Sequence, residues 1–121
     1  MTVKRRFLGA RGEDLALFYL RKLGYKLLDR NFSCPYGEID LILLDKKTLV
    51  FVEVKTRFSL RYGNPVEAVT KRKLKSILTT ANIFMKLNRR TPSSMRVDVV
   101  AIEVTGQGEL KSIRHLKNVT A

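Results

Sequence analysis

The order of hydrophobic and polar residues along the chain predicts two helices and five strands. A stripe of apolar residues at helical spacing predicts a helix over residues 10–23, which Gly24 would end. A second stripe predicts a helix that runs to about Leu87. Short apolar runs predict strands over residues 25–32, 38–44, 49–55, 95–104 and 110–116. The last strand carries several basic residues, as suits the edge of a sheet.

Capping residues mark the start of the second helix. Asn64 is an N-cap residue, Pro65 suits the first helical position, and Glu67 completes an arrangement like a capping box. The sequence therefore predicts a continuous helix from Pro65 to about Leu87. Residues 33–37 have the composition of a turn instead.

The strands over residues 38–44 and 49–55 are separated by a short polar turn, which predicts a hairpin. A symmetric loop of two or four residues would place Asp40 opposite Glu53, with Lys55 next to Glu53 on the same face. A three-residue loop with a bulge would shift this pairing by one residue. Two opposed carboxylates repel each other unless a cation lies between them, which favours a divalent metal site with Lys55 nearby.

The alternative for this face is a structural ion pair between Glu38 and Lys55, with the other acids merely exposed to solvent. Ile42 and Phe51 fall on the same face, so it is not simply solvated. Acids among buried apolar residues need a specific partner, so the pattern favours a functional site.

Glu13 is a third acid on an apolar stripe. It shares one face of the first predicted helix with Ala16, Leu17 and Leu20, which would direct it to the core. An acid in that position needs a partner or a nearby cation. The alternative is that Glu13 lies in the first turn, where the helix dipole favours acids, and reaches solvent.

Composition narrows the class of partner. The 121 residues suit a single domain over residues 1–121, and 24 Lys and Arg against 11 Asp and Glu give a formal net charge of +13. This excess predicts a polyanionic partner, and nucleic acid is favoured because no long basic amphipathic helix suggests a membrane surface. A basic surface that serves only solubility is the alternative.

Basic residues gather after the hairpin and early in the second helix. We expect phosphate contacts from four of them, although a solvated face is the alternative: Lys71, Arg72, Lys73 and Lys75. Lys71 lies at the edge of the apolar stripe and would reach towards the acidic face of the hairpin. Arg57 opens a basic and aromatic loop over residues 57–63 that would contact a nucleic acid backbone.

Other kinds of site find little support. Cys34 is the only cysteine, which excludes an internal disulfide and suits a reducing compartment, so we expect the cytoplasm. His115 is the only histidine, so neither a histidine-rich zinc site nor a serine-histidine triad can be assembled. Asp98 and its same-face neighbour Arg96 predict a structural ion pair. No signal-peptide core and no membrane-spanning apolar run is present, so no membrane partner is expected.

Asp40, followed thirteen positions later by Glu53-Val54-Lys55, resembles the PD-(D/E)xK signature of metal-dependent nucleases, with Ile39 in the place of proline. The helical Glu13 resembles the additional acid of archaeal Holliday junction resolvases. Longer stretches are similar to the YraN-like family of predicted endonucleases, and the resemblance covers about residues 7–104. The matching residues are Gly12-Glu13, residues 37–42, residues 50–57, Ala68 and Lys71.

This resemblance implies an α/β, restriction-endonuclease-like fold, in which a central mixed β-sheet is flanked by helices and the acidic hairpin lies in the middle. It implies that Asp40, Glu53 and the main-chain carbonyl of Val54 bind Mg²⁺ or Mn²⁺. Lys55 would position or help deprotonate the attacking water and stabilise charge on the phosphate. Glu13 would complete the site, either through water or by orienting Lys55.

Two functions follow as expectations. The first is a metal-dependent endonuclease that hydrolyses the phosphodiester bonds of DNA, including branched or junction DNA. The alternative is a non-catalytic nucleic-acid-binding protein that keeps the same fold and uses the acids structurally. The gathering of acids favours the enzyme, because carboxylates repel phosphate and would weaken a pure binding surface. Symmetric cutting of a four-way junction would need a two-fold homodimer, so a homodimer is a further partner to test.

Overall fold

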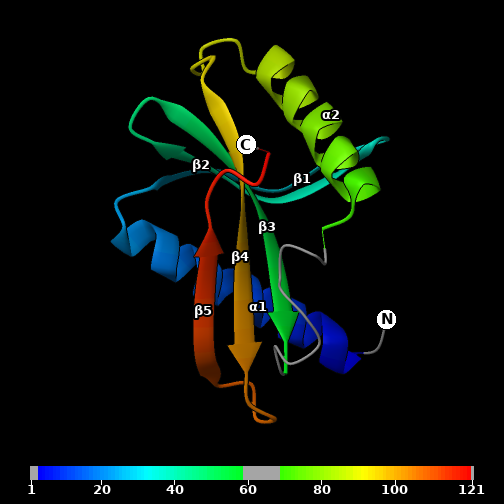
Figure 1. Ribbon diagram of the computed structural model, residues 1–121, viewed down its shortest axis with the longest axis vertical. Coiled ribbons are helices and arrows are strands. Elements are labelled where there is room, and N and C mark those ends of the chain that lie inside the picture. Colours follow the sequence, from blue (N-terminus) through cyan, green and yellow to red (C-terminus); the bar gives the residue numbers. More distant parts are fainter. Residues whose placement is uncertain (1–2, 59–68, 121) are drawn as a thin grey trace.

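The computed structural model describes residues 3–58 and 69–120, which form two helices and a five-stranded sheet. In the sheet, β3 and β4 run parallel, and the other neighbouring strands run antiparallel in the order β1-β2-β3-β4-β5. Figure 1 shows α1 and α2 on opposite faces of this sheet. The predicted α/β fold, a central mixed sheet flanked by helices, is therefore confirmed. The elements in chain order are α1 (Val3–Lys22), β1 (Lys26–Cys34), β2 (Gly37–Asp45), β3 (Thr48–Arg57), α2 (Lys71–Leu87), β4 (Met95–Val104) and β5 (Leu110–Leu116).

The predicted hairpin has the symmetric register. Asp45 pairs with Thr48 and Leu44 with Leu49, so β2 and β3 are joined by a two-residue loop, residues 46–47. The bulged three-residue loop is thereby excluded. The bounds predicted for β4 and β5 are also confirmed, and β5 forms one edge of the sheet.

The turn before β2 is shorter than predicted. Cys34 pairs with Gly37, so β1 continues through Ser33 and Cys34, and only Pro35 and Tyr36 connect the two strands. The turn-forming composition of residues 33–37 does not prevent backbone pairing at its two ends, because the partner strand supplies the hydrogen bonds.

Helix α1 ends as predicted but begins earlier. Gly24 has φ +95°, its N–H bonds to the carbonyl of Arg21, and the next N–H, that of Tyr25, bonds to the carbonyl of Leu20. This is a Schellman stop, which needs a residue with positive φ and so favours glycine. The helix begins at Val3 rather than near residue 10, so its first residues precede the apolar stripe from which the helix was predicted.

Helix α2 begins later than predicted. Thr70 is extended, with φ −67° and ψ 163°, and its hydroxyl accepts a hydrogen bond from the N–H of Lys73 at 3.1 Å. The helix therefore starts at Lys71, and the prediction of one continuous helix from Pro65 is wrong, since Val69 and Thr70 are not helical. Residues 64–67, with the predicted capping arrangement, lie outside the described residues. The predicted end at Leu87 is confirmed.

Each face of the sheet has its own apolar core. Helix α1 contributes Ala16, Leu17 and Leu20, which pack with β-strand residues that include Val50 and Val52. Helix α2 contributes Ile77, Ala81 and Phe84, which pack on the opposite face with residues that include Ile42 and Phe51. The period-2 alternation along β3 sends Val50 and Val52 to one core and Phe51 to the other. The strand is therefore buried on both faces.

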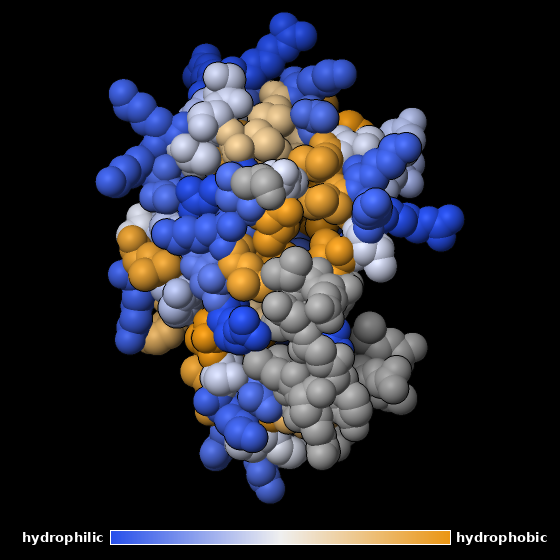
Figure 2. All heavy atoms as spheres, in the orientation of Figure 1, coloured by the Kyte–Doolittle hydropathy of each residue, from blue (hydrophilic) through white to orange (hydrophobic). Residues whose placement is uncertain are grey.

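Hydrophilic residues project from the margins of the face that carries α2, and hydrophobic residues gather in its middle (Figure 2). In the described part of the chain, neither helix has the length and apolar composition needed to cross a membrane.

Candidate active site

The predicted acids meet where the ladder between β2 and β3 ends. The paired residues run from Asp45 and Thr48 to Leu41 and Val52. The next residue of β2 towards its start is Asp40, and here a side chain bonds to β3: Asp40 Oδ2 accepts a hydrogen bond from the main-chain N–H of Val54 at 2.8 Å. The carboxylate of Asp40 is thus fixed against β3, directly beside Glu53.

Glu53 is a buried acid, with 6% of its surface exposed, and its two neighbours in β3 are the apolar residues Val52 and Val54. Its Oε1 lies 3.5 Å from the Nζ of Lys55 and 3.8 Å from the Nζ of Lys73. Its Oε2 is buried and has no hydrogen-bond partner among the described residues. Burial raises the pKa of Glu53, and the charge of Asp40 raises it further, while the two lysines oppose the shift. The site therefore holds a carboxylate oxygen whose burial costs free energy.

The ionised form of Asp40 is also disfavoured by burial and by a neighbouring acid. Burial raises its pKa, the hydrogen bond from Val54 lowers it, and the charge of Glu38 raises it again. Lys73 and Lys55 also oppose the rise. Two neighbouring acids with raised pKa values are typical of a site in which additional positive charge stabilises the ionised forms.

Helix α1 brings Glu13 to the edge of this site. Gly12 is buried against β3, and a Cβ there would collide with the side chain of Thr56, so only glycine permits this close approach. Glu13 is half-buried; burial raises its pKa and the charge of Asp40 raises it further. Its Oε1 lies 3.4 Å from the Nε of Arg30. The inward direction predicted for Glu13 is therefore partly right, with a partner that the sequence did not indicate.

Arg30 holds two acids of α1 from the neighbouring strand β1. Besides Glu13, it contacts Asp14, whose Oδ1 lies 2.8 Å from Nη2. Nothing in the local pattern identifies this contact, because β1 follows α1 only after the chain has turned back. Arg30 fixes the position of Glu13 near the other acids and partly neutralises it.

The donor set fits a hard divalent cation of the Mg²⁺ class. Asp40 and Glu53 provide carboxylate oxygens, and the main chain at Val54, tied to Asp40, provides a carbonyl. The partnerless Oε2 of Glu53 is the atom that a cation would satisfy. Across residues 3–58 and 69–120, no three His, Cys, Asp or Glu side chains converge closely enough to form a metal cluster. The fit is therefore to two carboxylates, with Glu13 outside the ligand set.

The basic cluster of α2 divides into one residue that joins the site and three that do not. Lys73 is half-buried and reaches Glu53, whereas the remaining three are exposed: Lys71, Arg72 and Lys75. The expectation that Lys71 reaches the acids is therefore wrong. The helix starts at Lys71, and its buried face follows Ile77, one turn beyond Lys73. The spacing of four between Lys73 and Ile77 was the available signal. Arg57 is half-buried at the end of β3.

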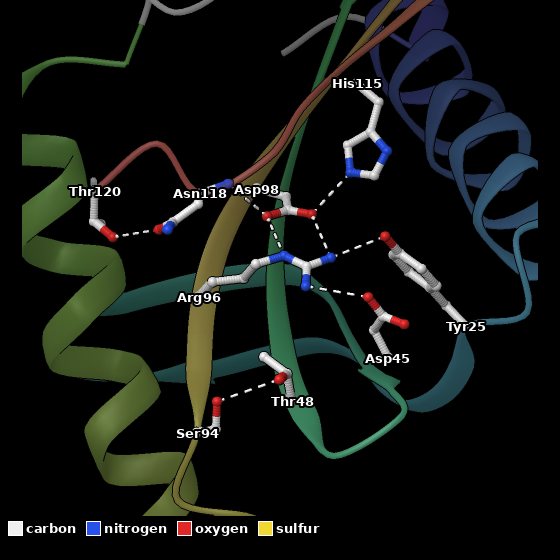
Figure 3. Close-up of polar contacts among 9 residues, drawn as sticks. All are labelled: Tyr25, Asp45, Thr48, Ser94, Arg96, Asp98, His115, Asn118 and Thr120. Carbon is white, nitrogen blue, oxygen red and sulfur yellow. Dashed lines mark hydrogen bonds and ion pairs between the residues drawn. The ribbon is translucent and has the colours of Figure 1, made fainter.

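A second buried acid lies nearby on β4 and is fully paired (Figure 3). The Oδ1 of Asp98 lies 3.0 Å from the Nε of Arg96 and accepts the N–H of Asn118 at 2.9 Å, and its Oδ2 lies 2.8 Å from the Nε2 of His115. Arg96 also bonds to Tyr25 and Asp45. The predicted pair of Arg96 and Asp98 is confirmed.

The pKa of Asp98 moves in the direction opposite to that of the site acids. Burial alone would raise it, but hydrogen bonds from His115, Asn118 and Arg96 together lower it. The sequence did not indicate that His115 belongs to this network, because strand pairing between β4 and β5 brings it to Asp98. This cluster is a satisfied structural network.

Comparison with known proteins gives a consistent result. A model of the uncharacterised protein family UPF0102 matches residues 12–102. The chain is 43% identical over 118 residues to a UPF0102 protein of Geobacter metallireducens, covering 98% of this chain and 95% of the relative. It is 48% identical over 113 residues to a UPF0102 protein of Syntrophomonas wolfei subsp. wolfei, covering 93% of this chain and 96% of the relative.

Proposed function

The chain belongs to the uncharacterised protein family UPF0102, and we propose that it is a metal-dependent endonuclease that hydrolyses phosphodiester bonds in DNA. One observation carries the proposal: the buried Oε2 of Glu53, next to the carboxylate of Asp40, has no hydrogen-bond partner in the described part of the chain. The resemblance of these residues to PD-(D/E)xK nucleases and to YraN-like endonucleases supports it. The formal charge of +13 supports a polyanionic substrate.

The ligand roles follow from the donor atoms. Asp40, Glu53 and the carbonyl of Val54 would hold Mg²⁺ or Mn²⁺. When bound, such an ion polarises the scissile phosphodiester and lowers the pKa of water. The hydrogen bond between Val54 N–H and Asp40 keeps the first carboxylate beside β3, so the two acids are held together before substrate arrives.

The two lysines have distinct roles in this proposal. Lys55 is close to Glu53, and about a quarter of its side chain, 27%, remains exposed, so its ammonium group is accessible to both the acids and a bound phosphate. There it would orient the attacking water and stabilise the charge that develops on the phosphate. Lys73, from α2, would add positive charge at the same oxygen of Glu53, Oε1. Glu13, held by Arg30, would orient water or Lys55 from α1.

The partner classes follow from the same chemistry. Branched or junction DNA is the substrate suggested by the resemblance to Holliday junction resolvases, and symmetric cutting of a junction would need a two-fold homodimer. Cys34 is a free thiol, as suits action on DNA in the cytoplasm.

The test is cleavage of labelled single-stranded, duplex, flap and four-way-junction DNAs with Mg²⁺ or Mn²⁺. Wild type should cleave at least one substrate, and Glu53→Gln should lower the rate by at least about 10²-fold, as when one charge-stabilising group is removed. Glu109→Gln makes the same chemical change at an exposed position in the β4–β5 connection and serves as control. If no substrate is cleaved but salt-sensitive DNA binding persists, the non-catalytic alternative replaces the nuclease.

A further inference from the structure

The connection between β1 and β2 exposes an aromatic side chain beside the candidate site. It consists of Pro35 and Tyr36, because Cys34 already pairs with Gly37. Tyr36 is 65% exposed. In Figure 1 this turn extends past the first half of α2.

The backbone of this turn is fastened to α2. The hydroxyl of Ser76 donates a hydrogen bond to the carbonyl of Tyr36 at 2.6 Å. A Cβ at Gly37 would collide with the hydroxyl of Ser76, so glycine allows the turn to lie directly on the helix. On the other side of the turn, the Sγ of Cys34 lies 3.6 Å from the Oγ1 of Thr80. The aromatic ring is therefore exposed on a fixed support, which lowers the entropy cost of using it for binding.

The same helix connects Tyr36 to the acids. Ser76 follows Lys73 by one helical turn, so α2 contacts the turn through Ser76 and Glu53 through Lys73. Along β2, Tyr36 precedes Asp40 by four residues, a span of about 13 Å at 3.3 Å per residue. This is the length of a few nucleotides, given about 3.4 Å per nucleotide of a stacked strand.

The surface between these points suits a nucleic acid strand. Arg72 and Lys75 are exposed on the first two turns of α2, and they flank Lys73 in the sequence. A strand whose scissile phosphate reaches Glu53 would meet these cations through its phosphates and Tyr36 through a base.

We propose that Tyr36 stacks on an unpaired base of the substrate, so that the chain selects DNA with single-stranded nucleotides close to the scissile phosphate. The inference rests on the proposed function and adds the substrate class. Stacking on an aromatic ring tolerates any base, because every base has a π face, but a base inside a regular duplex already has both faces covered. A flap or branch with unpaired nucleotides therefore offers Tyr36 a base to stack on, and an uninterrupted duplex does not.

The chain has no tryptophan, which allows a direct test. Tyr36→Trp places the only indole on the turn, and its fluorescence is followed in EDTA, so that DNA is bound without metal-dependent cleavage. Single-stranded and flap DNA should quench it, and a duplex of equal length should not. Phe18→Trp is the matched control, because Phe18 is 62% exposed on α1, on the other face of the sheet. Its fluorescence should not respond to any of the DNAs.

The DNA affinity of Tyr36 variants provides a second test of the stacking. Tyr36→Ala should weaken binding of flap DNA by roughly 5- to 150-fold and leave duplex binding unchanged, whereas Tyr36→Phe should retain the flap affinity. An unchanged thermal transition shows that Tyr36→Ala remains folded. Equal losses for flap and duplex, or bound flap DNA without quenching, would overturn the inference.

The two proposals fail in different ways. Cleavage of a flap by wild type without quenching of Tyr36→Trp refutes the stacking and keeps the nuclease. Quenching by flap DNA without cleavage in Mg²⁺ or Mn²⁺ refutes the nuclease and keeps the stacking.

Discussion

Glu53 and Asp98 are buried acids on adjacent parallel strands, and they differ in almost everything else. Asp98 pairs with Val52 across the ladder, one residue before Glu53 pairs with Val99. Asp98 is fully buried with both oxygens engaged, and its pKa is lowered. Glu53 is nearly as buried, but one oxygen lacks a partner among the described residues and its pKa is raised.

The difference shows that burial alone does not tell whether the protein stabilises the ionised form of an acid. Arg96, His115 and the Asn118 N–H give Asp98 directed hydrogen bonds, so its ionised form belongs to the fold. Glu53 has two lysines at 3.5 and 3.8 Å and another acid beside it. Its ionised form is incompletely stabilised by the protein, which is typical of groups kept for binding or catalysis.

The largest expected effect concerns the paired acid. Asp98→Asn should lower the free energy of unfolding by about 3–5 kcal/mol, because it removes the fully buried one of the two carboxylates that pair with the Arg96 guanidinium. Urea denaturation followed by circular dichroism measures the change. A loss below about 1 kcal/mol would remove the distinction between the two acids.

A bound metal ion should stabilise the folded chain through Glu53 and not through Asp98. Mn²⁺ at 100 times its Kd should stabilise wild type by about 2.7 kcal/mol, because it binds the folded chain. Glu53→Gln should lose this response, whereas Glu109→Gln should retain it. Thermal unfolding with and without Mn²⁺ gives the answer, and equal stabilisation of wild type and Glu53→Gln would place the metal elsewhere.

Without metal, Glu53→Gln should stabilise the chain at neutral pH by about 1 kcal/mol, because it removes a buried charge with an unpaired oxygen. The raised pKa of Glu53 means that the folded state binds more protons than the unfolded state. Wild-type stability therefore falls as pH rises from the ordinary value of 4.5 through the raised pKa, and the advantage of the variant should disappear in acid. A pH series of urea midpoints tests this, and a destabilised variant at neutral pH would make Glu53 structural.

The pH dependence of stability has the opposite sign for Asp98. Its lowered pKa contributes stability above the ordinary value of 3.8, and this contribution is lost as pH falls through the folded-state pKa. The same pH series should thus show the cost of Asp98→Asn shrinking in acid.

The smallest effect is expected from Lys73. Lys73→Ala should weaken DNA binding and reduce the slope of log affinity against log salt by about one, as for the loss of one phosphate contact. Lys26→Ala, an exposed lysine at the start of β1, is the control. An unchanged slope in Lys73→Ala would restrict Lys73 to its contact with Glu53.

The parts of the fold that were predictable are those governed by local pattern. The hairpin register follows from alternation and loop length, and the bounds of β4 and β5 follow from apolar runs. The start of α2 was missed because good capping residues at 64–67 precede the Thr70 cap that the structure uses. Local propensity ranks such caps but does not choose between them.

The site shows the same division. The sequence brings Asp40, Glu53 and Lys55 together, because they lie on one hairpin. The contacts from Arg30 to Glu13 and from Lys73 to Glu53 depend on how separate elements pack, which no local period encodes. His115 was missed as a partner of Asp98 for this reason too.

The Asp98 network also bears on how the chain folds as it is synthesised. Its members are Tyr25, which directly precedes β1, residues of β2, β4 and β5, and Asn118 after β5. As the chain emerges from the ribosome, the hairpin residues appear before Asp98, and Asp98 remains without His115 and Asn118 until residue 118 has emerged. The acids of β2 and β3 are thus synthesised before the residues that complete the Asp98 network, His115 and Asn118.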